Sequence, residues 1–534
     1  MKGRVQSGGL AIPVLVAAGV CLILGIASTV SRGLPDPVKH DEHSLLLAAD
    51  TFAHGRLTTP TPEHWQHFER FHALLEPSYQ SKYPTGPSLL LALGQTLGHP
   101  IVGVWLGLAA LAGATVWMLA GFVDRRWALL GGLLVAVRFG LPNYWLLSYW
   151  GGAVAAVGGA LVFGALPRML RPPPEAPESF ARRLAAPALF GLGAVLLALS
   201  RPLEGLLFLT VCGAVLLVGL GRRPRDERAR TAAAWTLGAG AIGLIGIAWL
   251  LAHNHAVTGD TLRLPYQEYE AQYAIVPQFL WLDAGEVPAY RHLVHLRYHL
   301  GVLARYERLQ NPGELAHANV RRLVLSWEFF VGFLLLVPLL AAPWARPGRW
   351  LALVAGLCGL YALVLAGYQS FHPHYIAPLT APLMLVIVAG LERLSRLPLV
   401  RRLDASTHAR VAWALAGLLL TAVAVERGIV TRDRYLASAA RHHAPQAQAT
   451  LRESLRAQGG RHLVLVHLLP DSSIHDEWIV NGADLGAQAV LWAFDRGPEG
   501  NRALLESESG RTAWLLQVGA DPRQATLTKV RDAL

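Results

Sequence analysis

The chain is poor in charged residues, in cysteine and in lysine. Of its 534 residues only 16% are charged, whereas soluble domains usually carry about 25%. The three cysteines, Cys21, Cys212 and Cys358, all lie inside apolar runs, which excludes a disulfide framework and a cysteine-based metal site. An apolar share of 53% and a mean hydropathy of +0.36 also exclude a disordered chain or a nucleic-acid-binding protein. The class that remains is a membrane protein.

Long apolar runs with almost no charge dominate the sequence. A helix needs about 20 apolar residues to cross the hydrocarbon core of a bilayer. We therefore expect an α-helical polytopic membrane protein with about eleven transmembrane helices. The first is expected to be an uncleaved helix, because no small-residue cleavage site closes it. The windows fall near 10–30, 99–121, 126–140, 146–166, 184–199, 203–220, 232–252, 324–343, 349–368, 375–391 and 409–428.

Basic residues are concentrated in alternate short loops. When the N-terminus is placed in the cytoplasm, the arginine-rich short loops all fall on the cytoplasmic side, as the positive-inside rule requires. The formal net charge of +11 then reflects orientation and not an anionic partner. Large polar segments are expected on the outer side at about 31–98, at about 253–323 and after about 430.

The C-terminal region differs in character from the rest of the chain. A polar helix at 446–458 precedes strand-like segments at 463–468, 489–494 and 513–518. We therefore expect two domains, a transmembrane domain over 1–430 and a small outer α/β domain over 431–534. This tail also contains His475-Asp476-Glu477-Trp478, which we interpret as a loop between strands.

An acidic pair opens the first outer segment. The motif His40-Asp41-Glu42-His43 follows the first span by about ten residues and precedes an apolar-periodic stretch, 45–53, that predicts a short helix. Adjacent carboxylates suit a general base with a supporting acid, or a divalent-cation site. The competing interpretation is helix capping, because acidic residues are favoured in the first turn of a helix.

The same segment ends in the turn Lys82-Tyr83-Pro84-Thr85-Gly86-Pro87, which leads into an apolar stretch, 88–97. The chain has 43 arginines and only 4 lysines, so a lysine at this membrane-proximal turn is informative. Its ammonium could bind a lipid phosphate as a point charge. Alternatively, Lys82 and Tyr83 anchor the chain at the membrane interface.

Two further outer junctions carry basic residues. Arg201 lies between two spans, where it could bind a phosphate or pair with Glu204. His374 could donate to a phosphate oxygen or cap the helix that follows. The many other histidines lack the two-His, one-Glu helix spacing of metalloproteases, so a transition-metal site is not expected.

Taken in order, these features resemble the glycosyltransferase-C superfamily. They are the uncleaved first helix, the acidic pair, the Lys-Tyr-Pro-x-Gly-Pro turn, and about eleven spans followed by an outer C-terminal domain. Within the superfamily the chain is most similar to the bacterial branch related to protein mannosyltransferases and aminoarabinose transferases. The resemblance covers about residues 1–430. The Trp-Trp-Asp motif of oligosaccharyltransferases is absent, which argues against transfer of a whole oligosaccharide to asparagine.

The resemblance implies transfer of a sugar from a polyprenyl-phosphate donor to an acceptor hydroxyl on the outer face, with inversion. Asp41 would be the base, with Glu42 beside it, and Lys82 with Tyr83 would bind the lipid phosphate. Arg201 and His374 lie at outer helix ends similar to those that hold basic phosphate ligands in relatives. No cofactor is certain, and a divalent cation at the acidic pair stays open.

The expected location is the bacterial inner (plasma) membrane, with the C-terminal domain periplasmic or extracellular. The expected partners are the bilayer, the polyprenyl-phosphate sugar and a glycan, lipid or protein acceptor, with no nucleic acid. One alternative is a transporter or flippase for a lipid-linked saccharide, although span centres nearly free of charge count against it. Another is a surface sensor or scaffold that acts through its tail.

Overall fold

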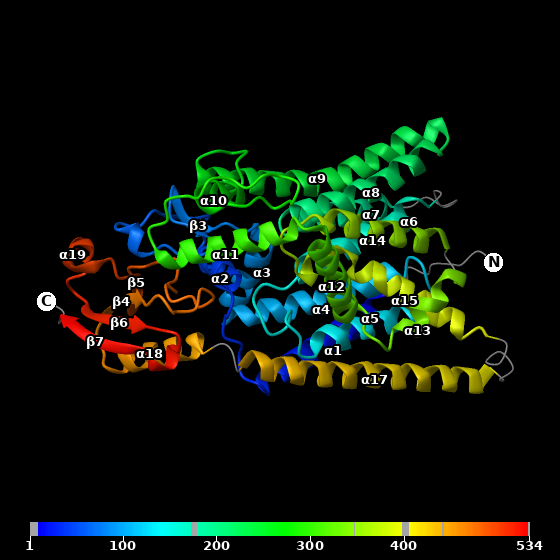
Figure 1. The fold of residues 1–534 in the computed structure, drawn as a ribbon. Coiled ribbons are helices and arrows are strands. Elements are labelled where there is room, and N and C mark those ends of the chain that lie inside the picture. Colours follow the sequence, from blue (N-terminus) through cyan, green and yellow to red (C-terminus); the bar gives the residue numbers. More distant parts are fainter. Residues whose placement is uncertain (1–8, 172–178, 346–347, 398–404, 440–442, 532–534) are drawn as a thin grey trace.

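The computed structural model describes residues 9–171, 179–345, 348–397, 405–439 and 443–531. Figure 1 shows long helices gathered at the end of the molecule that holds the N-terminus, and the strands gathered at the opposite end near the C-terminus. The long helical region consists of α1 (Ala11–Val30), α4 (Pro100–Leu119), α5 (Arg125–Gly140), α6 (Ala153–Met169), α7 (Phe180–Ala198), α8 (Pro202–Gly221), α9 (Arg225–Thr258), α12 (Pro312–Phe330), α13 (Leu336–Ala341), η2 (Ala342–Trp344), α14 (Gly348–Ala366), η3 (Pro373–Leu379), α15 (Thr380–Leu394) and α17 (Ala405–Ala439).

Shorter elements lie between the long helices and the tail. The first loop region forms α2 (His40–Ala53), β1 (Thr59–Pro60), η1 (Trp65–His67), β2 (Ala73–Leu74), β3 (Ser78–Ser81) and α3 (Thr85–Thr96). The second forms α10 (Pro265–Tyr273) and α11 (Leu293–Leu309). The tail forms α18 (Ala444–Ala457), β4 (His462–Leu468), β5 (Val490–Phe494), α19 (Gly497–Ser507), β6 (Thr512–Val518), η4 (Pro522–Gln524) and β7 (Thr526–Arg531).

Seven helices in the described part of the chain are long and apolar enough to cross a membrane. They are α1, α4, α7, α8, α9, α14 and the continuous segment Pro373–Leu394, and α6 is a shorter apolar helix. These helices occupy eight of the eleven windows expected from sequence. The mostly helical fold is therefore confirmed, while the full number of transmembrane helices stays a prediction.

Two expected spans are not continuous helices. The window 324–343 is interrupted between α12 and α13, where Gly332 has a φ of 74°. Arg138 of α5 bonds the carbonyl oxygens of Glu328 and Phe329 at 2.5 and 2.7 Å, and Glu426 of α17 accepts from the backbone N–H of Phe333 at 2.9 Å. Side chains from neighbouring helices therefore satisfy backbone groups at the break.

The window 146–166 also starts late, because α6 begins only at Ala153. The preceding residues form an irregular segment in which the side-chain amide of Asn143 donates to the carbonyl oxygens of Phe139 and Leu141. This amide takes over backbone acceptors at the end of α5, which favours a turn over continued helix.

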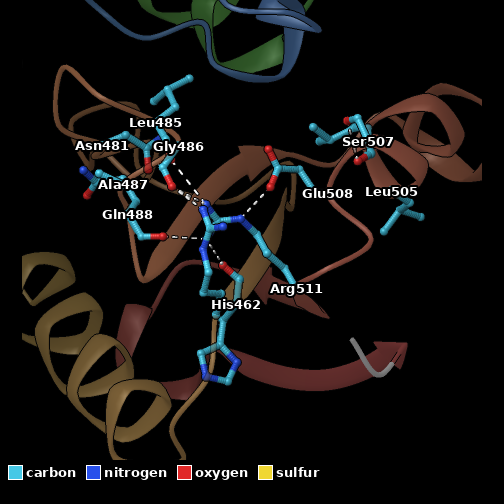
Figure 2. A network of polar contacts seen from close by, with 12 residues as sticks. His462, Asn481, Leu485, Gly486, Ala487, Gln488, Leu505, Ser507, Glu508 and Arg511 are labelled. Atoms are coloured by element: carbon cyan, nitrogen blue, oxygen red, sulfur yellow. Dashed lines mark hydrogen bonds and ion pairs between the residues drawn. The ribbon is translucent and has the colours of Figure 1, made fainter. Parts of the chain in front are cut away.

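The tail folds around a four-stranded sheet in the order β5-β4-β6-β7, in which β4 is parallel to β5 and β6 and β7 is antiparallel to β6. All three strand-like segments of the tail thus contain strands. The buried side chain of Arg511 ties this sheet to the loop before β5 (Figure 2). Its guanidinium donates to Gln488 O and Leu485 O at 2.5 and 3.3 Å and pairs with Glu508 at 2.6 Å.

The sheet of the tail shares its two apolar faces with the loops of the first 430 residues. On β4, Val464 and Val466 belong to a buried cluster with Phe71 and Val294, whereas Leu463 and Leu465 belong to one with residues of the first loop. Alternation along the strand sends these pairs to opposite faces. Helix α17 also passes the expected boundary at 430. The division into 1–430 and 431–534 stays a prediction.

Candidate functional site

Helix α2 begins at the first acidic motif and holds Asp41 and Glu42 in its first turn. The half-buried carboxylate of Asp41 accepts a 2.5 Å hydrogen bond at Oδ1 from the hydroxyl of Tyr83. Among the described residues, no protein donor reaches Oδ2 of Asp41. Asp41 is therefore held in one orientation through one oxygen while the other remains available for a substrate hydroxyl.

Glu42 points the other way. Its side chain is 2% exposed, and its Oε2 accepts from the backbone N–H of Val38 at 2.7 Å. Burial raises the pKa of Glu42 from 4.5 to about 7, against the lowering effect of backbone hydrogen bonds from Val38 and Lys39. Each interpretation of the acidic pair thus applies to a different residue. Glu42 stabilises the start of α2, whereas Asp41 contacts Tyr83 and faces the polar residues described below.

Replacement of Glu42 by glutamine should flatten the dependence of stability on pH. The pKa of Glu42 is higher in the folded protein than the unfolded value of 4.5. Glu42 therefore adds a contribution to the free energy of unfolding that is fully present below about pH 4.5 and is lost as the pH rises through about 7. At about 1.4 kcal/mol per pH unit the loss is about 3 kcal/mol. Thermal unfolding of the purified protein between pH 4.5 and 8 measures it. The exposed Glu63→Gln should follow the wild type, and a Glu42→Gln curve equally steep would contradict the assignment.

The first turn of α3 packs against the C-terminal end of α7. The N–H of Gly86 donates to the carbonyl oxygen of Leu199 at 2.6 Å, and a Cβ at this glycine would lie 2.8 Å from the same oxygen. Only glycine allows this approach. Since Lys82 lies four residues before Gly86 and Arg201 two residues after Leu199, this contact brings the two expected phosphate ligands into one region.

Lys82 lies in a cage of tyrosine rings and one carboxylate. The residue is 6% exposed, and its Nζ forms a 3.1 Å ion pair with Glu270. The same Nζ lies 4.2 Å from the ring centre of Tyr269, 4.8 Å from that of Tyr266 and 5.6 Å from that of Tyr83. An ammonium has three donors, and Glu270 takes one of them. This environment keeps the ammonium desolvated and oriented.

Arg201 occupies the N-cap position of α8, and among the described residues its side chain forms no hydrogen bond to the start of this helix. Its guanidinium lies 4.5 Å above the ring of Tyr375, and in the described part of the chain it forms no ion pair with Glu204. Burial raises the pKa of Tyr266 well above 10, Glu270 and Tyr375 raise it further, and Arg201 lowers it. Tyr266 therefore responds to the charge of Arg201 while lying beside Lys82.

The His-Pro-His segment contributes a neutral imidazole. His374 is 1% exposed and its Nδ1 lies 3.2 Å from the hydroxyl of Tyr144, so it supports the wall of the site. His372 stacks on it with ring centres 5.4 Å apart. Burial lowers the pKa of His372 to about 4, although the charge of Asp41 raises it; Arg201 and Arg305 lower it further. His372 thus responds electrostatically to Asp41 and Arg201.

The structure brings together most of the residues expected from sequence. Asp41 accepts a hydrogen bond from Tyr83, and Lys82 directly precedes Tyr83 in the same turn. The pKa of His372 responds to the charges of both Asp41 and Arg201. Sequence reasoning did not single out Glu270 or Tyr298. Burial, and then the charge of Asp41, raises the pKa of Tyr298. The sequence feature that could have indicated them is the polar, tyrosine-rich segment at about 253–323.

The tail reaches this site through its own His-Asp-Glu motif. Glu477 Oε2 accepts from the backbone N–H of Phe71 at 3.3 Å and lies 3.2 Å from Nδ1 of His40, and Nε2 of His40 lies 3.0 Å from the carbonyl oxygen of Ile474. The ring of His40 packs 4.0 Å from that of Phe71. The residue next to Asp41 is therefore held by the tail.

A metal site is not formed by these side chains. Within the described ranges, no group of three or more His, Cys, Asp or Glu side chains has an arrangement that could hold a metal ion. Glu42 is directed toward Val38, which leaves Asp41 as the one member of the acidic pair with an available oxygen. The divalent cation considered from sequence stays an open expectation.

Comparison with known proteins identifies the fold. No protein-family model and no curated protein sequence matches the chain. Among solved structures it is similar to ArnT from Cupriavidus metallidurans in the apo state, with a TM-score of 0.50 and 16% identity over 94% of this chain and 92% of that one. It is also similar to an oligosaccharyltransferase from Archaeoglobus fulgidus tethered to an acceptor peptide, with a TM-score of 0.50 and 12% identity over 96% and 69% of the two chains.

Proposed function

Because the chain has the fold of the glycosyltransferase-C superfamily, we propose that it is a membrane glycosyltransferase. It moves a sugar from a polyprenyl-phosphate donor to an acceptor hydroxyl on the outer face of the bacterial inner membrane, with inversion at the anomeric carbon. The observation that supports this best is the juxtaposition of an oriented carboxylate, Asp41, with two cations, Lys82 and Arg201, grouped around Tyr83, Tyr266 and Tyr375.

In the proposed reaction Asp41 accepts the proton of the acceptor hydroxyl. The oxygen of that hydroxyl forms a bond to the anomeric carbon of the donor while the bond from this carbon to the phosphate oxygen breaks. The electron pair leaves with the polyprenyl phosphate, whose developing charge is stabilised by Lys82 and Arg201. Tyr83 keeps Asp41 oriented through its 2.5 Å hydrogen bond. The isoprenoid chain lies against the apolar helices.

The proposed orientation of the protein in the membrane is supported by the distribution of basic residues and by the position of the site. The arginine-rich short loops face the cytoplasm in this proposal, and α2, α10, α11 and the tail lie on the outer side. A flippase for a lipid-linked saccharide is the alternative function, but such proteins place ionisable groups on a path through the bilayer. The cluster of Asp41, Lys82 and Arg201 instead lies at the ends of the spanning helices, where α8 begins.

The test is an assay of the purified protein in lipid with a panel of polyprenyl-phosphate sugars. We expect release of free polyprenyl phosphate with at least one donor when a membrane extract supplies acceptors. A heat-denatured sample is the blank, and movement of the intact donor between leaflets is measured in parallel. Movement of the donor without release of polyprenyl phosphate would replace the transferase by the flippase, and absence of both would overturn the proposal.

A further inference from the structure

A polar cavity lies near the cluster around Asp41, and its residues have no part in the proposed chemistry. It has a volume of about 340 Å³, within the range of about 300–1,000 Å³ that small-molecule sites occupy. It lies between the first outer loop, the end of α10 and the start of α11. The lining includes Glu69, Glu76, Tyr273, Ala289, Arg291 and His295.

Two buried polar atoms in this lining lack hydrogen-bond partners. Glu69 is 1% exposed, and its Oε1 accepts from Tyr273 and Arg291, each at 3.1 Å. Its Oε2 lies 3.2 Å from Nε2 of His292, but that nitrogen bonds the carbonyl oxygen of Gln66 at 2.8 Å. Oε2 therefore accepts no hydrogen bond from the described residues. The Nε2 of His295, 3% exposed, also has no partner. Such atoms are rare in proteins unless water or a ligand satisfies them.

The chemistry of the lining favours a neutral polyhydroxyl ligand. Burial lowers the pKa of His295 well below 6.5, so its imidazole is neutral and pairs with a hydroxyl better than with an anion. Glu69 and Glu76 also repel an anion, and Arg291 already pairs with Glu69, which disfavours a cation at that carboxylate. A hydroxyl group both donates and accepts, so the hydroxyls of a sugar suit Glu69 and His295, which both line the cavity.

The cavity adjoins the proposed catalytic cluster through aromatic side chains. The ring of Tyr273 lies 4.9 Å from that of Tyr269, which packs against Lys82. The ring of His295 lies 4.5 Å from that of Phe71, which packs against His40 beside Asp41. A glycan that presents its terminal hydroxyl to Asp41 would therefore have further sugar units near this cavity.

We infer that this cavity is a saccharide-binding subsite that holds a non-reacting sugar unit of the acceptor. That the bound sugar belongs to the acceptor rests on the proposed function, but sugar binding itself does not require transfer. Its specificity comes from the buried pair Glu69 and His295, which a ligand without paired hydroxyls would leave unsatisfied.

Saturation-transfer difference NMR on the protein in lipid nanodiscs, without donor, tests the inference. The probes are the methyl glycosides of hexoses, pentoses and N-acetylhexosamines. We expect at least one of them to bind the wild type. The signal should fall at least fivefold in Ala289→Trp, which fills the cavity from its exposed rim and removes no polar group, and in Glu69→Gln. The matched control Ala284→Trp, in the same loop but outside the lining, should bind as the wild type does.

Binding should also persist in Asp41→Asn, since that carboxylate lies outside the cavity lining. Two outcomes overturn the inference: no methyl glycoside binds the wild type, or Ala289→Trp binds as well as the wild type. These failures are distinct from failure of the proposed function. Sugar binding without release of polyprenyl phosphate would refute the transferase and keep the subsite, whereas release without sugar binding would do the reverse.

Discussion

Asp41→Asn is expected to lower the turnover number for sugar transfer by about 10²–10⁴-fold, the contribution typical of a general base. The amide has the shape of the carboxylate and its oxygen can still accept the 2.5 Å hydrogen bond from Tyr83, so the local structure should be preserved. What is lost is the capacity to accept the proton of the acceptor hydroxyl. The loss should therefore fall on turnover, with the KM for the donor nearly unchanged.

Release of polyprenyl phosphate under saturating donor measures this loss, and thermal unfolding verifies the fold. Asp36→Asn is the matched control, because Asp36 is an exposed aspartate in the same loop five residues earlier. A variant that keeps more than a tenth of wild-type turnover would remove Asp41 from the role of base. If Asp41→Asn moved donor between leaflets normally while the wild type released no polyprenyl phosphate, the flippase would be favoured.

Local patterns were sufficient for much of the fold. Apolar runs predicted helices such as α1, α4 and α8 because the length of a spanning helix is set by the bilayer and not by its neighbours. The broken segment between α12 and α13 could not be predicted in this way. Its backbone groups form hydrogen bonds with Arg138 and Glu426, which belong to helices distant in the sequence. A hydropathy pattern is local and cannot predict such contacts.

The candidate site shows the same division. Asp41 and Lys82 were candidates from sequence because acidic and basic residues in a loop next to an apolar span are chemically conspicuous, and Tyr83 was a candidate as the neighbour of Lys82. Glu270, which pairs with Lys82 at 3.1 Å, was missed because it belongs to another loop, 188 residues away. Residue types can suggest which groups carry chemistry, but the partner that tunes each group is set by tertiary packing.

The tail contributes the contact that sequence reasoning assigned to an ordinary loop. Glu477 was interpreted as part of a loop between strands, and it does lie in the loop between β4 and β5. From this loop its carboxylate accepts from the backbone N–H of Phe71 and faces His40, next to Asp41. The sheet behind it also buries Phe68 and Phe71 of the first loop. Deleting the tail would uncover these side chains, so loss of activity after deletion would not distinguish a sensor from a transferase. A point variant at Glu477 makes a sharper test.

Glu477→Gln is expected to destabilise the protein by about 1–3 kcal/mol, the range for a buried donor left without its acceptor, and to lower turnover at least tenfold. The amide nitrogen would replace either Oε2, which accepts from the N–H of Phe71 and faces His40, or Oε1, which accepts from the N–H of Ile479 at 3.3 Å. At least one hydrogen bond is lost in either case, and we expect the start of α2 to shift. Thermal unfolding measures the first effect and polyprenyl phosphate release the second. Glu506→Gln, an exposed glutamate on α19, is the matched control and should behave as the wild type.

A double-mutant cycle with His40→Gln separates positioning from general stability. If Glu477 acts through His40, the double variant should lose less than the sum of the two single losses, with a coupling of about 0.5–3 kcal/mol in both unfolding and turnover. Glu477→Asp should restore part of the turnover, because a carboxylate again faces the imidazole, whereas the KM for the donor should change little in every variant. Additive losses, or turnover that follows thermal stability alone across the series, would show that the tail merely supports the fold and does not position Asp41.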